Sequence, residues 1–228
     1  MIDHYDWSGG REAMLRLGPE HGPVVIVALP LFEEANRTRA FAVTICRALA
    51  AKGIANALPD LPGQGESLMP TRGVSLADLR SAFAAAARHL GDSGIYGVSI
   101  RSGALIDTAA ALSARWHFAP MMGEATVREL IRTARAADPQ RDDLDPVDVE
   151  RLEPIEIAGS LLSPALLRDI KMASPGAARI VRLDTSGSDA ELFVPGPPLW
   201  HRAEPDNDPA LAALLADDIA DWIARCDG

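Results

Sequence analysis

Cysteine is nearly absent from this 228-residue chain, which holds only Cys46 and Cys226. Two isolated cysteines support neither a disulfide framework nor a clustered metal site, so they fit a reducing compartment. The sequence also lacks a basic, apolar leader at its start and any apolar run of membrane-spanning length. We therefore expect a cytoplasmic protein that does not insert into a membrane.

Basic residues are also few, with 22 lysines and arginines against 32 acidic residues and a net charge of −10. Such a chain gains no counterion release on nucleic acid or on an anionic membrane surface, which excludes both as expected partners. No pair of histidines has metal-site spacing, and no Walker or dinucleotide-binding glycine motif occurs. The sequence predicts no metal and no cofactor. The expected partner is a small-molecule ligand or substrate, and a homodimer is an open option.

Short strands and longer helices alternate along the chain. Continuous apolar runs rich in valine and isoleucine are typical of strands buried on both faces. They are Val24–Leu29, Ile54–Leu58 and Ile95–Ile100. Between them, helical spacing covers 36–52 and 75–90, and it returns at 209–225. The pattern predicts one α/β domain over 1–228 with a doubly wound, mostly parallel sheet, whose sites lie at the carboxyl ends of the strands. Residues 123–172 are predicted to form a small cap, in which 138–154 is an acidic mobile loop or lid edge.

The stretch Gly94–Ala110 reads as a buried strand that turns sharply into a helix over 103–114, and it allows two registers of a nucleophile elbow, G-x-S-x-G. In the first, Ser99 is the nucleophile, but Arg101 then stands where a small residue is required. In the second, Arg101 is at the apex, and Ser99 and Gly103 satisfy the steric requirement without supplying a nucleophile. Packing favours the second register. Ser102 is expected to be the N-cap of the following helix.

A serine-type triad can be assembled in the chain order Ser, acid, His. Asp184 ends a predicted strand at 178–183, and His201 precedes the last predicted helix. In a triad of Ser99, Asp184 and His201, the histidine would take the serine proton and the aspartate would hold the imidazole tautomer. The alternative is that Asp184 is a turn residue and His201 a solvated loop residue.

The loop after Leu29 would border the same site. A backbone N–H near Leu31 or Phe32 would supply an oxyanion-hole donor if acyl chemistry occurs. The residues that follow are Glu33, Glu34 and Asn36, which form either a ligand-facing cluster or the acidic first turn and N-cap of the next helix.

With Arg101 at the apex, a glutamate of this loop could form a structural ion pair with it. A site built from Arg101, Glu34 and His201 would then be non-standard.

Several blocks resemble a known family. Asp60, Gly63, Gly65 and Ser67 form D-x-x-G-x-G-x-S, which resembles the loop after the fourth strand of α/β-hydrolases. The block 30–39, PLFEEANRTR, is similar to the P-F-A-E-E-M-N-K-x-R block of the exosortase A system-associated hydrolases of type 2. Further similar blocks lie at 100–105, 118–124, 156–164 and 196–200. The resemblance implies an α/β-hydrolase fold encoded beside exopolysaccharide and exosortase genes, and in the family pattern the elbow position is itself an arginine.

Two functions follow as hypotheses. The first is a serine-type hydrolase that acts on an ester or amide bond. The second is a catalytically silent protein of the same fold that binds a small molecule or a partner, because Arg101 would occupy the nucleophile position. The residue at the elbow apex discriminates between them.

Overall fold

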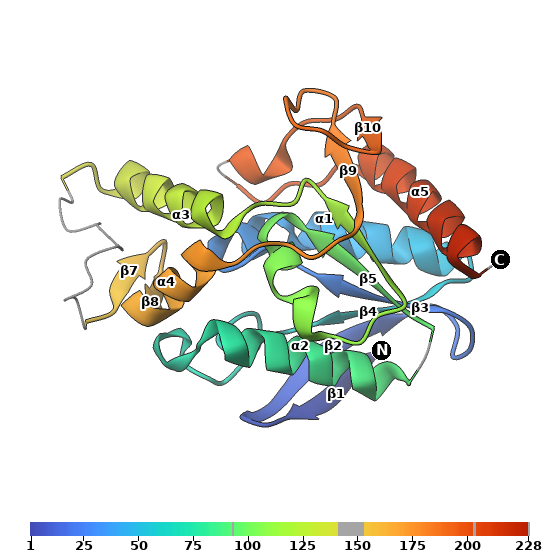
Figure 1. The fold of residues 1–228 in the computed structure, drawn as a ribbon, viewed down its shortest axis with the longest axis horizontal. Coiled ribbons are helices and arrows are strands. Elements are labelled where there is room, and N and C mark those ends of the chain that lie inside the picture. The colour runs from blue at the N-terminus through green and yellow to red at the C-terminus, as the bar shows by residue number, and fades with distance from the viewer. Residues whose placement is uncertain (93, 141–152, 203, 228) are drawn as a thin grey trace.

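An eight-stranded sheet forms the centre of the molecule in the computed structural model, which describes residues 1–92, 94–140, 153–202 and 204–227 (Figure 1). Its strand order is β1-β2-β4-β3-β5-β6-β9-β10. The strands are β1 (Ile2–Trp7), β2 (Gly10–Leu17), β3 (Val24–Ala28), β4 (Ala55–Pro59), β5 (Ile95–Ile100), β6 (Ala114–Phe118), β9 (Arg179–Leu183) and β10 (Leu192–Val194). β1 pairs antiparallel with β2, and β2 pairs antiparallel with β4. The strands that follow in the sheet, in the order β4, β3, β5, β6, β9 and β10, pair in parallel.

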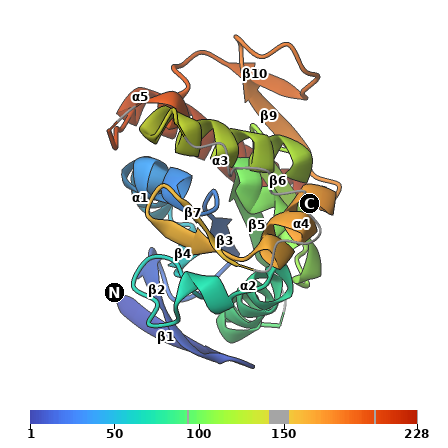
Figure 2. The same cartoon turned by 90° about the vertical axis from the view of Figure 1, so that its left-hand side faces the viewer.

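Helices cover both faces of this sheet, since β3 and β5 are buried throughout. The helices are α1 (Glu33–Ala51), α2 (Leu76–Leu90), α3 (Gly123–Ala137), α4 (Pro164–Met172) and α5 (Pro209–Asp227). α1 and α5 share a buried cluster with Val25 and Val27 of β3, and α2 shares the other cluster with Val24 and Ile26. Alternate side chains of one strand therefore enter opposite layers. Figure 2 shows β1 and β10 at opposite ends of the sheet.

The segment between β6 and β9 adds a smaller unit beside the sheet. α3 packs against α4, and the hairpin of β7 (Ile155–Ile157) and β8 (Ser160–Leu162) lies with them (Figure 1). Most of the acidic segment expected to be a lid edge, 141–152, lies outside the described residues. Within the described ranges, no helix is both long and apolar enough to cross a membrane.

Local sequence signals specify several elements correctly. The strand predicted at Ile95–Ile100 and the helix predicted at 75–90 are confirmed. α2 begins with a capping box, in which Ser75 Oγ accepts from the Asp78 N–H while the Asp78 carboxylate accepts from the Ser75 N–H. Such a reciprocal pair satisfies two donors at the start of a helix.

The predicted helix over 103–114 is wrong. Two short 3₁₀ helices, η2 (Arg101–Leu105) and η3 (Asp107–Ala109), follow β5, and β6 begins at Ala114. The Arg115 guanidinium donates to the carbonyls of Asp107 and Ala110. These acceptors are thus satisfied without a continuing α-helix, and the Asp107 side chain is held in the interior.

Candidate functional site

Arg101 stands at the sharp turn between β5 and η2. Its φ is 54°, in the left-handed region that costs a non-glycine residue about 1–2 kcal/mol. Phe32, after β3, and Ala119, after β6, have φ values of 59° and 47°. These strands are neighbours in the sheet, so the strained residues gather at one edge, as is common in functional sites. This geometry corresponds to the register with Arg101 at the apex.

Gly103 lets the turn approach β3 closely. A Cβ added there would lie 2.4 Å from the Ala28 carbonyl oxygen and 2.6 Å from that of Leu29. Both neighbours are backbone atoms, so neither can rotate away. The small residue two positions after the apex is therefore a steric requirement of this turn.

Gly103→Ala is expected to lower the free energy of unfolding by about 1–3 kcal/mol, because overpacking against backbone strains the turn. Urea unfolding measures the change. The matched control is Gly73→Ala, since nothing lies within 4 Å of a Cβ at that position. Equal stability of the two variants would show that the turn can relax away from β3.

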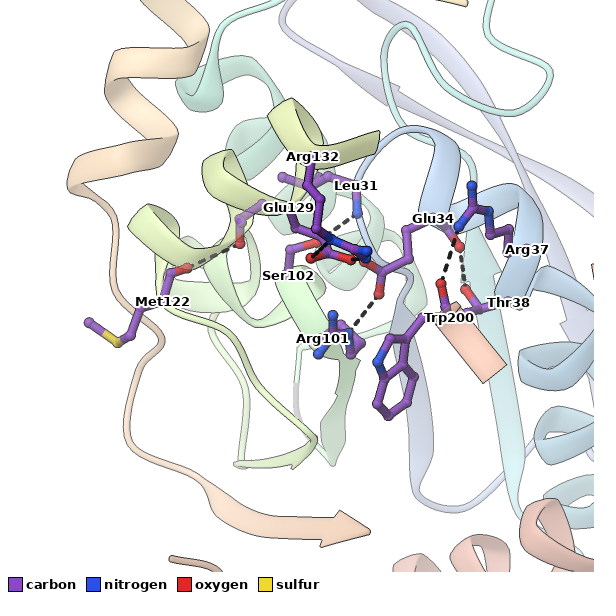
Figure 3. A network of polar contacts seen from close by, with 11 residues as sticks. Leu31, Glu34, Arg37, Thr38, Arg101, Ser102, Met122, Glu129, Arg132 and Trp200 are labelled. Carbon is purple, nitrogen blue, oxygen red and sulfur yellow. Dashed lines mark hydrogen bonds and ion pairs between the residues drawn. The ribbon is translucent and has the colours of Figure 1, made fainter. Parts of the chain in front are cut away.

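The Arg101 side chain is fixed by a carboxylate and an aromatic ring (Figure 3). Its Nε donates to Glu34 Oε1 at 2.7 Å, and its Cζ lies 4.4 Å from the centroid of the Trp200 ring. The side chains of Arg101 and Glu34 are only 11% and 14% exposed. A charge-assisted hydrogen bond and a cation–π contact thus hold one guanidinium. The ion pair expected between Arg101 and a loop glutamate is present.

Trp200 is positioned in turn by α1. Arg37 Nη1 donates to the Trp200 carbonyl at 3.3 Å, and Arg37 Nε pairs with Glu33. Glu33 and Glu34 are both in the first turn of α1, which begins at Glu33. Each glutamate therefore binds an arginine.

Two ionisable groups of the site have shifted pKa values. Burial raises the pKa of Glu34 above its ordinary value, although Arg101 acts in the opposite direction. Partial burial lowers the pKa of His201, and Arg101 contributes to the lowering while Glu129 opposes it. The lowered pKa favours the neutral form of the His201 imidazole.

Ser99 belongs to a buried cluster beneath the turn. Its Oγ donates to Asp107 Oδ2 at 2.6 Å, and His117 Nε2 lies 2.8 Å from the same oxygen. Ser99 and His117 are direct partners in the register of β5 and β6, which explains why one carboxylate reaches both. The three residues are at most 1% exposed. Arg115 Nε lies 3.6 Å from Asp107 Oδ1 and completes the cluster.

The other two residues of the predicted triad lie apart from this cluster. Asp184 follows β9 and is exposed, and His201 is exposed in η4 (Leu199–His201) beside Trp200. No hydrogen bond among the described residues joins Ser99, Asp184 and His201; Ser99 is bonded to Asp107 instead. The triad stays a prediction.

Both predicted oxyanion-hole donors already have partners. The Leu31 N–H donates to Ser102 Oγ at 2.9 Å, and the Phe32 N–H donates to Gln64 Oε1 at 2.8 Å. A substrate oxygen would have to displace a side chain to use either donor. The prediction that Ser102 is an N-cap is wrong. Ser102 lies inside η2, and its hydroxyl accepts a hydrogen bond from the Leu31 N–H in the loop after β3.

Asn36 is likewise not an N-cap. It is an exposed residue within α1, and Phe32 occupies the cap position without a side-chain hydrogen bond. The helix starts three residues earlier than predicted, at Glu33, and the N–H of the preceding Phe32 donates to Gln64 of another loop. No sequence pattern identifies Gln64 or Asp107 as a residue of this site. Trp200 lies in the block 196–200, which is similar to a block of the family named above, but the block assigns it no role.

Two hollows border Trp200, and one of them also borders Arg101. One is small, about 20 Å³, and includes Glu33, Glu34 and Glu129 in its lining. The other, about 230 Å³, lies on the β9 side and is lined in part by Arg101, Arg182 and His201. Among the described residues, no group of three or more His, Cys, Asp or Glu side chains could hold a metal ion.

Solved structures of known proteins share this architecture. Est1E from Butyrivibrio proteoclasticus, with ferulic acid bound, is 15% identical over 98% of this chain and 99% of its own, with a TM-score of 0.67. The bottromycin epimerase BotH, in complex with bottromycin A2, is 16% identical over 97% of this chain and 99% of its own, with a TM-score of 0.57. The chain thus has the α/β-hydrolase fold, as predicted.

A third structure matches only in part. The epoxide hydrolase VrEH1 from Vigna radiata is 19% identical over 52% of this chain, with a TM-score of 0.43, and the match spans 39% of that protein's length. No known family model matches the chain. No curated protein matches it either.

Proposed function

We propose that this chain binds a small molecule at the carboxyl ends of β3, β5 and β6, and that it has no activated serine. The observation that carries the proposal is Arg101 at the apex of the elbow turn, held by Glu34 and Trp200. The apex is the position that presents a nucleophile in an elbow. A guanidinium stays protonated and has no lone pair to offer, so it can bind a ligand but cannot attack one.

The neighbouring folds support a small-molecule site. Est1E holds ferulic acid and BotH holds bottromycin A2. BotH is an epimerase, which illustrates that this fold serves chemistry other than hydrolysis. The fold alone therefore does not select a reaction, and the residues at the turn have to decide it.

A second candidate is hydrolysis of an ester or amide bond by Ser99, Asp184 and His201. One observation favours it: His201 borders the same hollow as Arg101, and its lowered pKa leaves a neutral imidazole that could act as a base. This mechanism requires Ser99 to leave Asp107 and reach the surface.

Labelling with a fluorophosphonate probe separates the two candidates. We expect no adduct on the folded chain by intact-mass spectrometry, because Ser99 is buried and hydrogen-bonded and the apex carries no hydroxyl. A serine hydrolase of known activity, labelled in parallel, controls for the probe. A single adduct that disappears in both Ser99→Ala and His201→Ala would establish an activated serine and overturn the proposal.

The sequence blocks described above support a finer placement among the exosortase A system-associated hydrolases of type 2. The block at 30–39 carries most weight, because its two glutamates are the ones that bind Arg37 and Arg101. The link to exopolysaccharide or exosortase systems, like the cytoplasmic location, remains part of this proposal.

A further inference from the structure

We infer that the hollow on the β9 side of Trp200 binds the anionic group of a small organic ligand, a carboxylate or a phosphoryl group, through Arg101 and Arg182. The inference rests on the proposed small-molecule function and names the class of ligand.

The lining of this hollow is basic although the chain is acidic. It measures about 230 Å³, and Arg101 and Arg182 both line it. None of the described lining residues is an aspartate or glutamate; Asp184, adjacent in sequence, is exposed and is not part of the lining. Two guanidinium groups thus share one hollow without a carboxylate between them, in a chain with a net charge of −10.

Arg101 has donors to spare. Its Nε is taken by Glu34, and among the described residues no acceptor is bonded to its terminal nitrogens. The Trp200 ring packs against the guanidinium, whose Cζ lies 4.4 Å from the ring centroid. A guanidinium held in this way is preorganised for a planar, two-oxygen acceptor such as a carboxylate.

Arg182 lacks an acidic partner within the described part of the chain. Its Nε donates to the Asp189 carbonyl at 3.2 Å, and Nη2 lies 3.4 Å from the Pro120 carbonyl. Carbonyl oxygens orient the side chain but do not neutralise it. Burial lowers the pKa of Arg182, and the charge of Arg101 lowers it further. A bound anion would offset this repulsion, since it would give Arg182 an opposite charge that it lacks and would add to the one that Arg101 has in Glu34.

The rest of the lining fits a small ligand with an apolar part. Trp200, Leu183 and Pro198 supply apolar surface, and Thr185 and Ser186 carry hydroxyl groups. The volume is below the roughly 300–1,000 Å³ of sites for drug-sized molecules. A compact anion with a flat apolar group matches both the size and the chemistry.

The test compares three probes at constant ionic strength by protein-observed NMR: benzoate, its neutral analogue benzamide, and inorganic phosphate. We expect benzoate to bind at least about tenfold more tightly than benzamide, and Arg182→Met to weaken benzoate binding about tenfold or more, the loss typical of a charge-assisted hydrogen bond. The matched control, Arg47→Met, removes the same charge from an exposed position of α1 and should leave the affinity unchanged. Binding of phosphate in competition with benzoate would indicate phosphoryl ligands, and binding of benzoate alone would indicate carboxylates.

Equal affinity for benzoate and benzamide, or unchanged benzoate binding in Arg182→Met, would overturn the anion site. Failure of both anions to bind would overturn it as well. These results are independent of the proposed function: benzamide bound beside Trp200 would retain a small-molecule site, and fluorophosphonate labelling decides on its own whether a serine is activated.

Discussion

Asp107→Ala is expected to lower the free energy of unfolding by about 3–5 kcal/mol, the loss seen when one member of a buried ion pair is removed. Asp107 is fully buried and is the common partner of Ser99, His117 and Arg115. Its removal leaves a buried hydroxyl and an imidazole without their hydrogen-bond partner, and a guanidinium without its counterion. Urea unfolding followed by circular dichroism measures the difference.

Two further variants make this result specific. Asp169→Ala removes an exposed aspartate from α4 and should change stability by no more than about 0.5 kcal/mol. Ser99→Ala removes a single donor to Asp107 and should cost about 1–3 kcal/mol. If Asp107→Ala were no less stable than Ser99→Ala, the cluster would not be the structural support of the turn.

The second large effect concerns the ion pair at the apex. Arg101→Met is expected to lower the free energy of unfolding at pH 7 by about 3 kcal/mol, the lower end of the range for a buried pair because both side chains keep some exposure. The change leaves the Glu34 carboxylate buried without a counterion. It also removes the cation–π contact with Trp200.

The loss should depend on pH with a defined sign. Burial already raises the pKa of Glu34 above its unfolded value, and removing Arg101 raises it further. A group whose pKa is raised in the folded state favours folding at low pH, and this contribution is lost as the pH rises through the folded pKa. The stability gap between Arg101→Met and the native chain should therefore be widest near pH 7 and should narrow as the pH falls toward 4.

Glu34→Gln provides the companion measurement. In the double variant with Arg101→Met no uncompensated carboxylate remains, so part of the stability returns and the pH dependence from this site disappears. A double-mutant cycle isolates the coupling between the two side chains. A coupling energy near zero would mean that Trp200, not Glu34, holds the arginine.

Sequence patterns predict the framework of this fold well because its signals are local. The run Ile95–Ile100 is buried on both faces, and the Ser75 and Asp78 pair is a capping box whose partners are three residues apart. The apex position of Arg101 could also be predicted, because the small residues on either side of it impose one register. Steric requirements of this kind can be judged without knowing the rest of the molecule.

Contacts between distant segments could not be predicted in this way. Small apolar residues after Gly103 favour a helix locally. In the structure, Arg115 donates to the carbonyls of Asp107 and Ala110, and the Asp107 carboxylate binds Ser99 of β5 and His117 of β6. Arg182 reaches the Arg101 hollow because β9 lies two places from β5 in the sheet, a fact of strand order. No periodicity in the sequence reports such an order.

The strained backbone at the carboxyl edge has a consequence for engineering. Phe32, Arg101 and Ala119 adopt positive φ values that glycine tolerates without penalty. A stabilisation campaign guided by backbone geometry alone would choose glycine at these positions, to relieve about 1–2 kcal/mol of strain at each. At Arg101 it would lose about 3 kcal/mol with the ion pair to Glu34, and at Phe32 it would remove a buried side chain. It would also remove the Arg101 guanidinium and the Ala119 methyl group from the lining of the hollow. The side chains of Phe32 and Arg101 therefore contribute more to stability than their backbone strain costs, and backbone geometry alone would misdirect the choice of substitutions.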